Sequence, residues 1–267
     1  MPSATVPAMG DPTPTAARPA ARLWFPRQHG AWAMLAVPLL LGIAATGLSP
    51  WHLLLAVAAL AGYLAAATAQ AWLRARRRPS FIPSLAVYGS TFGAAGLVLV
   101  VAFPALALTA IVVVPAGALV IGGARTGTPR DLANSLAQTA IALVLVPAAA
   151  YVSGAWETNA VIGATLVAAG YLVGTVLVVR SVIRERGNRS FVALSVGFHA
   201  AFLAVAAVAL PWPYAACAAG LLARAVALPL VERRRAGTSR PLRPVQVGIV
   251  EIVASTVLVI VAFAVPF

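Results

Sequence analysis

Long apolar segments follow one another along almost the entire chain, and short polar segments separate them. Each apolar segment comes close to the roughly 20 residues that a helix needs to cross the hydrocarbon core of a bilayer. Hydropathy and the helix-breaking prolines together place about nine such spans. The predicted spans lie near residues 31–48, 51–73, 81–102, 104–123, 132–153, 158–180, 191–210, 213–231 and 245–265. The pattern therefore predicts an all-α, polytopic transmembrane helix bundle.

The first 21 residues differ from everything that follows. They are rich in Pro, Ala and Thr, and they contain no apolar run that a fold would bury. This composition is typical of a disordered segment, and the missing early apolar core argues against a signal peptide. We expect a disordered cytoplasmic tail over residues 1–21 and a single transmembrane helical domain over residues 22–267.

Charge is scarce, and its placement follows the predicted spans. Charged residues make up 9% of the chain, whereas an ordinary soluble protein carries roughly 25%. The net charge is +13, and all 19 basic residues are arginines. All of them except Arg224 precede the first span or occupy every second connection, while the alternate connections contain none. Because cationic loops stay on the cytoplasmic side, the pattern predicts a cytoplasmic N-terminus and an external C-terminus, and it favours membrane orientation over nucleic-acid binding.

The motifs of common metal and cofactor sites are missing from the sequence. Cys217 is the single cysteine, so neither an internal disulfide nor a cysteine-based metal site is indicated. The histidines form no H-x-x-H or H-E-x-x-H pattern, and a chain without lysine has no P-loop. We therefore expect no metal ion and no cofactor.

Two charged residues fall inside predicted spans. Glu251 lies in the last span, roughly 10 Å along the helix from Pro244, and Arg224 lies at a similar depth in the preceding span. A charge near the bilayer centre costs about 2.5–3.5 kcal/mol, so such side chains face protein or water. Consecutive spans are antiparallel, which lets the two side chains pair. The pair would either fix the packing of two helices or contact a substrate.

Other polar residues continue from the connections into the spans. Asp131, Asn134 and Gln138 recur every three to four residues on one face of the fifth span, where Asp131 suits the positive end of the helix dipole. They represent either a capped helix start with a polar stripe or part of a cavity open to the cytoplasm. His199 lies about two turns into the seventh span, where a packed, hydrogen-bonded histidine is commoner than a ligand.

The polar cluster Arg27-Gln28-His29 comes directly before the first span. Trp24 and Trp32 flank it, as aromatic anchors do at a membrane interface. We expect the cluster at the cytoplasmic end of the first span.

Two stretches resemble a known family. FPRQHGAWAMLAVPLLLG, at residues 25–42, resembles the opening signature of the YwiC-like family of bacterial membrane proteins, and RPVQVGIVEIVAS, at residues 243–255, resembles the end of that family. The number of spans and the basic connections fit as well, so the resemblance covers nearly everything after the tail. It implies a multi-pass protein of the bacterial cytoplasmic (inner) membrane.

A more distant likeness is to the UbiA superfamily of intramembrane prenyltransferases. Members have nine helices, an N-terminus inside, and functional loops after their second and sixth helices. VPLLLG at residues 37–42, LVPAAAYVSG at 145–154 and GNRSF at 187–191 are similar to their first helix, fifth helix and second functional loop.

That resemblance implies Asp-rich motifs that hold Mg²⁺-diphosphate, and here the sequence departs from the family. The first corresponding loop, TAQAWLRARRRPSF, has no acidic residue, and the second, LVVRSVIRERGNRSF, has only Glu185. Mg²⁺ needs hard oxygen ligands such as carboxylates. A Mg²⁺-dependent prenyltransferase is therefore not expected, and the absence of these Asp-rich motifs argues against an enzymatic function.

Binding of an anionic or isoprenoid-like lipid without Mg²⁺ is the favoured function, because arginine binds phosphate bidentately. The alternative for the same arginines is membrane orientation and contact with the anionic headgroups of the bilayer. The candidate ligand contacts are Arg27, Gln28, His29, Arg74, Arg125, Arg180 and Arg184.

Two further functions stay open. One is a transporter, which the echo between RRPSFIPSL and GNRSFVALS supports because it suggests two similar halves. The other is a divergent prenyltransferase, or another residual enzyme with His29 or Glu251 as its acid or base. The intramembrane polar candidates for a transport path are Asp131, Asn134, Gln138, His199, Arg224 and Glu251.

Overall fold

The computed structural model describes residues 24, 31–128, 131–235 and 242–267. Over these ranges the secondary structure is helical throughout, without strands. The predicted tail over residues 1–21 and the cluster Arg27-Gln28-His29 lie outside the described residues.

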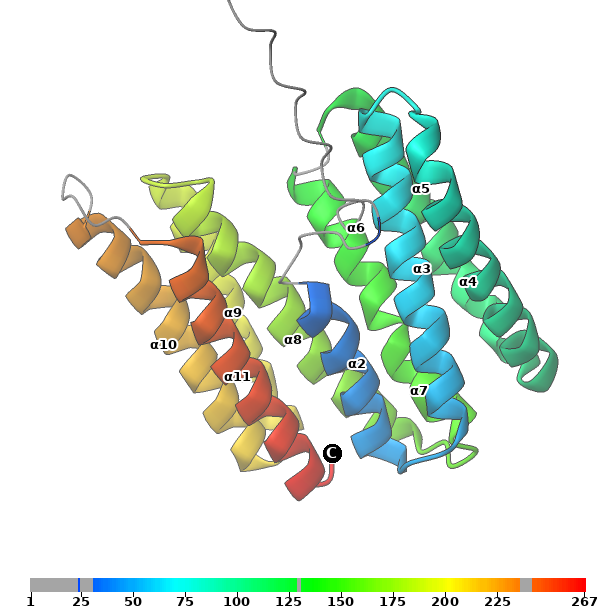
Figure 1. The fold of residues 1–267 in the computed structure, drawn as a ribbon. Helices are drawn as coiled ribbons and strands as arrows, with labels where there is room; N and C mark the ends of the chain where they lie inside the picture. The colour runs from blue at the N-terminus through cyan, green and yellow to red at the C-terminus, as the bar shows by residue number, and fades with distance from the viewer. Residues whose placement is uncertain (1–23, 25–30, 129–130, 236–241) are drawn as a thin grey trace, which may run out of the picture.

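The helices match the predicted spans closely (Figure 1). Eight stretches in the described ranges are long and apolar enough to cross a membrane, and a shorter apolar helix, α2, precedes them. The prediction of an all-α, polytopic bundle of about nine spans is therefore confirmed. The helices are α2 (Ala31–Thr46), α3 (Trp51–Arg74), α4 (Ile82–Ala102), α5 (Ala110–Thr126), α6 (Leu132–Leu143), α7 (Leu145–Val152), α8 (Thr158–Ile183), α9 (Arg189–Ala209), α10 (Trp212–Arg235) and α11 (Pro244–Ala264), with 3-10 turns at Pro79–Phe81 and Pro104–Thr109.

The fifth predicted span consists of two helices in line, α6 and α7. The interruption falls at Val144, three residues before Pro147. Proline has no backbone N–H, and its ring collides with the carbonyl four residues earlier, so the hydrogen-bond ladder of a straight helix cannot continue past it. The sequence shows this proline, but span prediction by hydropathy does not register the break.

The bundle consists of two groups of helices with α2 between them (Figure 1). We call α3 to α7 the first group and α8 to α11 the second group. Helix α2 packs against α7 on one side and against α8 and α11 on the other. Gly42 makes the first of these contacts possible, because a Cβ atom there would lie 2.6 Å from the carbonyl oxygen of Val146.

Burial differs strongly between the helices. In the apolar 18-residue stretch of α8, 61% of the residues are buried inside the protein. In the corresponding stretch of the span that contains α4, only 11% are buried. Helix α8 is therefore the central helix of the bundle, and α4 presents most of its surface to the outside. In a membrane that surface faces lipid, since apolar side chains such as Leu97 and Val101 cover it.

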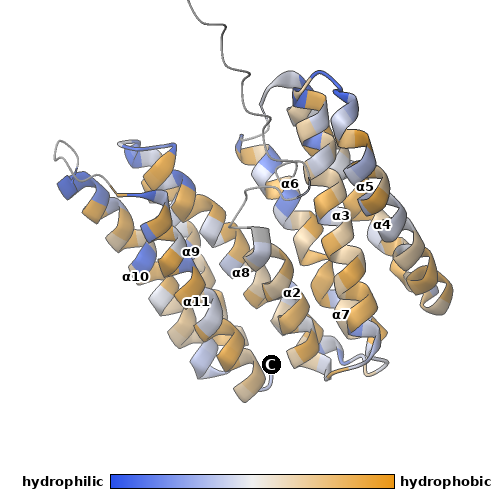
Figure 2. Ribbon diagram, in the orientation of Figure 1, coloured by the Kyte–Doolittle hydropathy of each residue, from blue (hydrophilic) through white to orange (hydrophobic). Residues whose placement is uncertain are grey.

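The arginine-bearing connections lie together at one end of the bundle (Figure 2). We call this the arginine-rich end; it includes the connections from α3 to α4 and from α8 to α9, the last turns of α5 and α10, and the start of α11. The opposite end holds the connections around Ser49, Phe103, Gly154 and Pro211, none of which contains an arginine.

Candidate functional site

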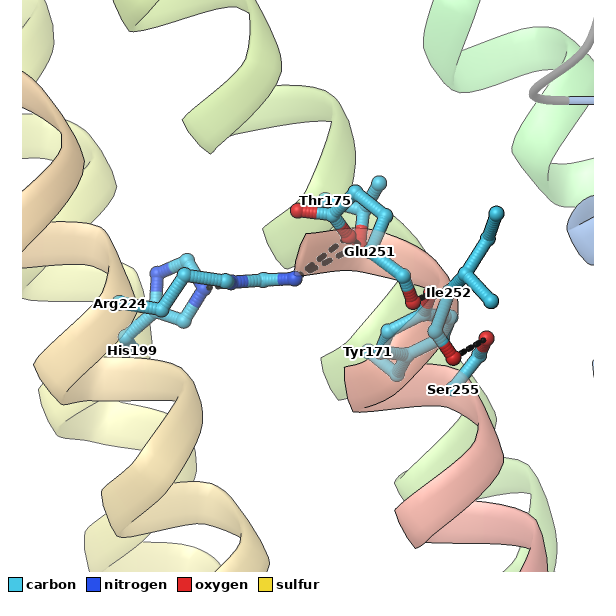
Figure 3. Close-up of polar contacts among 7 residues, drawn as sticks. All are labelled: Tyr171, Thr175, His199, Arg224, Glu251, Ile252 and Ser255. Carbon is cyan, nitrogen blue, oxygen red and sulfur yellow. Dashed lines mark hydrogen bonds and ion pairs between the residues drawn. The ribbon is translucent and has the colours of Figure 1, made fainter. Parts of the chain in front are cut away.

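A buried charged cluster joins all four helices of the second group (Figure 3). Arg224 of α10 reaches across to Glu251 of α11, and Nη1 donates to Oε2 over 2.5 Å. Thr175 of α8 donates its hydroxyl to the same Oε2 atom over 2.8 Å. The side chains of Arg224 and Glu251 are only 5% and 11% exposed. The pairing that the sequence allowed between these two residues is thus confirmed.

The cluster lies well inside the spans. Glu251 is seven residues into α11, and Thr175 is eight residues before the end of α8. At 1.5 Å per residue, both are about 10–12 Å from the arginine-rich ends of their helices. Intramembrane charges that far from water are rare in membrane proteins, and they mark either buried ion pairs or functional sites.

His199 of α9 lies on the other side of the Arg224 guanidinium. Its Nδ1 lies 2.7 Å from the carbonyl oxygen of Ser195, and its Nε2 lies 3.5 Å from Nη2 of Arg224. A carbonyl oxygen only accepts, so the proton of the neutral ring belongs on Nδ1 and Nε2 faces the arginine as an acceptor. His199 is fully buried.

Helix α8 leaves room for this histidine because it has a glycine opposite. A Cβ atom at Gly174 would lie 2.7 Å from His199 Nε2, and one at Gly170 would collide with the ring of Phe202. The two glycines are four residues apart on one face of α8. Such small residues let transmembrane helices approach closely.

Tyr171 of α8 completes the cluster. Its hydroxyl donates to the backbone carbonyl of Glu251 over 3.2 Å, and its ring centre lies 6.0 Å from the Arg224 guanidinium carbon. Tyr171 and Thr175 were not predicted as site residues from the sequence, because single hydroxyl residues are common in apolar helices. Their spacing of four residues on α8 is the one signal that they share a face.

Part of the hydrogen-bonding capacity of this cluster is unused. Glu251 Oε2 has two donors, whereas Glu251 Oε1 is buried and has no hydrogen-bond partner among the described residues. The same is true of Arg224 Nε and of the Ser195 hydroxyl. A buried polar atom without a partner costs about 1–3 kcal/mol, so such atoms are exceptions that call for a reason.

The polar residues of α6 do not belong to the cluster. Asp131 caps the helix, with Oδ1 accepting from the Asn134 backbone N–H over 2.7 Å. The Asn134 side chain is buried against Gly123 of α5, and neither of its amide atoms has a partner in the described part of the chain. Gln138 is half-buried. Of the six intramembrane candidates, the described hydrogen bonds therefore join His199, Arg224 and Glu251 only.

Two arginines of the second group at the arginine-rich end have acidic partners. Arg180 pairs with Glu185 over 3.3 Å, and Arg186 pairs with Glu232 over 3.0 Å. Asn188 caps α9, accepting from Phe191 N–H, and also donates to Glu185. These contacts order the turn between α8 and α9. Arg184 is exposed on that turn.

The first group has no such pairing. Arg74 and Arg125, which the sequence nominated, are exposed at the ends of α3 and α5 and make no ion pair with a described residue. Arg77 lies over the ring of Trp72, 5.7 Å from its centre. Across the described ranges, no three His, Cys, Asp or Glu side chains gather to hold a metal ion. The first group thus offers free cationic side chains at its arginine-rich end.

Comparison with known proteins links the chain to one family. Residues 25–151, which cover α2 to α7, match the family model described as YwiC-like protein. The chain is also 30% identical over 179 residues to the uncharacterized protein YwiC of Bacillus subtilis (strain 168), covering 65% of this chain and 73% of the relative. No solved structure matches. The charged cluster of α8 to α11 lies outside the residues that the family model matches.

Proposed function

This chain belongs to the YwiC-like protein family, and from that premise we propose that its first group binds the anionic head of a lipid without a metal ion. The bundle of long apolar helices makes it a multi-pass integral membrane protein. The name of the relative assigns no activity, so the proposal rests on the geometry of the chain itself.

One observation carries the proposal, which is the set of unpaired arginines at the arginine-rich end of the first group. All of them are exposed, and none forms an ion pair with a described residue. Guanidinium groups bind phosphate and carboxylate with two parallel hydrogen bonds, so they need no metal ion as an intermediary. The set comprises Arg74, Arg76, Arg77, Arg78 and Arg125.

The absence of nearby carboxylates supports binding without a metal. In the described part of the first group at this end, the acidic residue is Asp131, and its side chain is engaged as the cap of α6. A single engaged carboxylate is a poor ligand set for Mg²⁺, which requires near-octahedral oxygen coordination.

An apolar surface for the lipid tail lies beside these arginines. The spans of α4 and α5 are only 11% and 17% buried, and near the arginines they present side chains such as Ile82, Val87 and Leu119 to the outside. An amphiphile whose head contacts Arg74 to Arg78 would lay its chain along this surface. An isoprenoid-like chain or a fatty acyl chain would fit equally, because apolar burial has no directional requirement.

The proposal includes an orientation. We place the arginine-rich end on the cytoplasmic side of the bacterial inner membrane, with the N-terminus inside and the C-terminus outside, because cationic connections are retained there. Anionic lipids on that side attract each nearby arginine by about 1 kcal/mol. A relation to UbiA-type enzymes stays a prediction, and the proposal does not need it.

Transport is the second candidate function. It has a specific observation in its favour, because His199, Arg224 and Glu251 join inside the spans. The other three residues of the predicted path lie on α6, outside that cluster. An acid pulse applied to proteoliposomes with a trapped pH dye tests this candidate. Proton entry that Glu251→Gln abolishes would support it, and no entry above empty liposomes would reject it.

Two matched double variants test lipid binding. Arg74→Gln with Arg78→Gln removes two charges from the first group, and Arg233→Gln with Arg234→Gln removes two from the second group at the same end. Lipids that copurify with each protein are identified by mass spectrometry, which separates phosphatidylglycerol from isoprenoid phosphates.

We expect the first variant to lose several-fold of the bound anionic lipid, while the second retains it. Unchanged lipid in both variants, or an equal loss in both, would reject a site in the first group. Equal loss would show that the arginines act only through overall charge.

A further inference from the structure

The ion pair between Arg224 and Glu251 is asymmetric. Glu251 Oε2 accepts from both Arg224 and Thr175, whereas Oε1 accepts from no described residue although it is buried. An ionised carboxylate has acceptor sites on both oxygens. A pair that served packing alone would be expected to use both oxygens, as bidentate arginine–carboxylate pairs do. The geometry therefore leaves one oxygen open to a further binding partner.

The groups around Glu251 narrow down what that partner is. Tyr171 faces it from α8, Arg224 faces it from α10, and His199 of α9 lies behind the guanidinium. Helix α2, which also packs against α11, contributes no titratable side chain. Arg180, nearer the arginine-rich end of α8, pairs with Glu185. The positive charge of Arg224 argues against a metal cation, and the carboxylate argues against an anion.

Two atoms in the cluster are able to take a proton, and they are not equivalent. His199 Nε2 would become a second cation 3.5 Å from Arg224 Nη2, which is an unfavourable like-charge contact. Glu251 Oε1 takes a proton without breaking any hydrogen bond, because it makes none. Oε1 is therefore the atom where an added proton disturbs the cluster least.

We propose that Glu251 is an intramembrane proton-binding site with Arg224 as its counter-ion. Oε1 accepts a proton from a hydronium ion: one O–H bond of the hydronium breaks, one O–H bond forms at Oε1, and a water molecule is released. Oε2 keeps its donors, Thr175 and Arg224, so the carboxyl group stays in place. The net charge of the cluster rises from zero to +1, and the Arg224 guanidinium loses the anion that balances it. This inference does not depend on lipid binding by the first group.

Infrared difference spectroscopy of the full chain in lipid nanodiscs tests the proposal. Acidification should produce carboxylic-acid C=O absorption that shifts in D₂O, and one component band of it should disappear in Glu251→Gln while the other acidic residues keep theirs. Glu232→Gln is the matched control, because Glu232 is as buried as Glu251, at 9% exposure, and also pairs with an arginine. The control should retain the band. C=O absorption in Glu251→Gln that is identical to that of the folded wild type, with no component lost, would overturn the proposal.

A second variant decides the matter if Glu251→Gln fails to fold. Thr175→Val keeps the shape of the side chain and removes the hydroxyl that donates to Oε2. The band should move to higher wavenumber, because the carboxyl group has lost a hydrogen bond. An unchanged frequency would show that the protonated group is not Glu251.

Discussion

The first and second groups of helices differ in how deeply their charged residues are buried and in how those residues are paired. In the first group, arginines are exposed and unpaired at one end, and the apolar core is built from residues such as Leu55, Leu99 and Leu106. In the second group, Arg180 and Arg186 at the same end pair with Glu185 and Glu232, whereas Arg233 and Arg234 are exposed and make no ion pair with a described residue. A further ion pair lies inside the spans. All buried charged residues in the described ranges belong to the second group.

This difference suggests different roles for the two groups, namely ligand binding by exposed arginines and protonation of a buried ion pair. An exposed, unpaired arginine keeps all its donors for a ligand, and its guanidinium is more weakly hydrated than an ammonium group. A buried pair is stable only while both partners are present, so removing either partner is strongly destabilising. The exposed arginines support the proposal of an anionic ligand at the first group, and the buried carboxylate supports the proposal of a proton-binding site in the second group.

The largest effect is expected from breaking the buried pair. Glu251→Leu or Arg224→Met alone leaves one unpaired charge inside the spans, and each should lower the free energy of unfolding by about 3–5 kcal/mol. The double variant should recover most of that loss, because no lone charge remains. Unfolding in SDS, followed by circular dichroism, measures all three.

Arg74→Met is the control for the first group and should be silent, since Arg74 is exposed and pairs with no described residue. Losses that simply add in the double variant would show that the two charges do not interact, and the contrast between the groups would fail.

A smaller effect is expected from filling the space beside α8. A Cβ atom at Gly174 would lie 2.7 Å from His199 Nε2, inside a tightly packed contact. Gly174→Ala should therefore lower stability by about 1–3 kcal/mol. Gly93 of α4 has nothing within 4 Å of its ideal Cβ position, so Gly93→Ala should be neutral or stabilising by up to about 1 kcal/mol.

Melting temperatures of the two alanine variants in the same detergent measure this contrast. A loss at Gly93 as large as that at Gly174 would mean that α4 is not the exposed helix that its low burial indicates.

In the first group, His52 links neighbouring elements by hydrogen bonds, as Arg224 and Glu251 link α10 and α11 by an ion pair. Its Nε2 donates to the Ala149 carbonyl over 2.9 Å, and its Nδ1 accepts from the Ser49 N–H over 2.9 Å. His52→Leu removes both bonds between α3, α7 and the preceding turn, and should cost about 1–2 kcal/mol. Because neither bond involves a charge, added salt should leave the loss unchanged. A salt-dependent loss in SDS titrations would contradict a neutral histidine.

Span prediction succeeded because it depends on local properties. Hydropathy and prolines such as Pro104 and Pro244 mark helix limits without reference to the rest of the fold. The pair of Arg224 and Glu251 was predictable for a similar reason, since charges inside spans are rare and these two lie in neighbouring antiparallel spans.

Features that depend on tertiary contacts were out of reach of the sequence. Thr175 belongs to the cluster only because α8 packs against α11, and nothing in its local sequence shows this. The pairing of arginines is a similar case. Arg186 and Arg74 look equivalent as residues of basic connections, yet Arg186 pairs with Glu232 of α10 and Arg74 has no ion-pair partner in the described part of the chain.

The smallest loss of stability is expected from breaking the partly exposed ion pair between Arg186 and Glu232 at the arginine-rich end. Glu232→Gln breaks the ion pair with Arg186, whose side chain is 43% exposed, so water screens the interaction. In the wild type, the Leu242 N–H donates to Glu232 Oε2 over 3.3 Å. The carboxamide oxygen of the variant can still accept this hydrogen bond. The loss should be about 1 kcal/mol or less, and it should vanish near 1 M salt, where the Debye length is about 3 Å. Melting temperatures of Glu232→Gln and of the wild type at low and high salt measure it, and a loss that persists at high salt would place this pair with the buried one at Arg224.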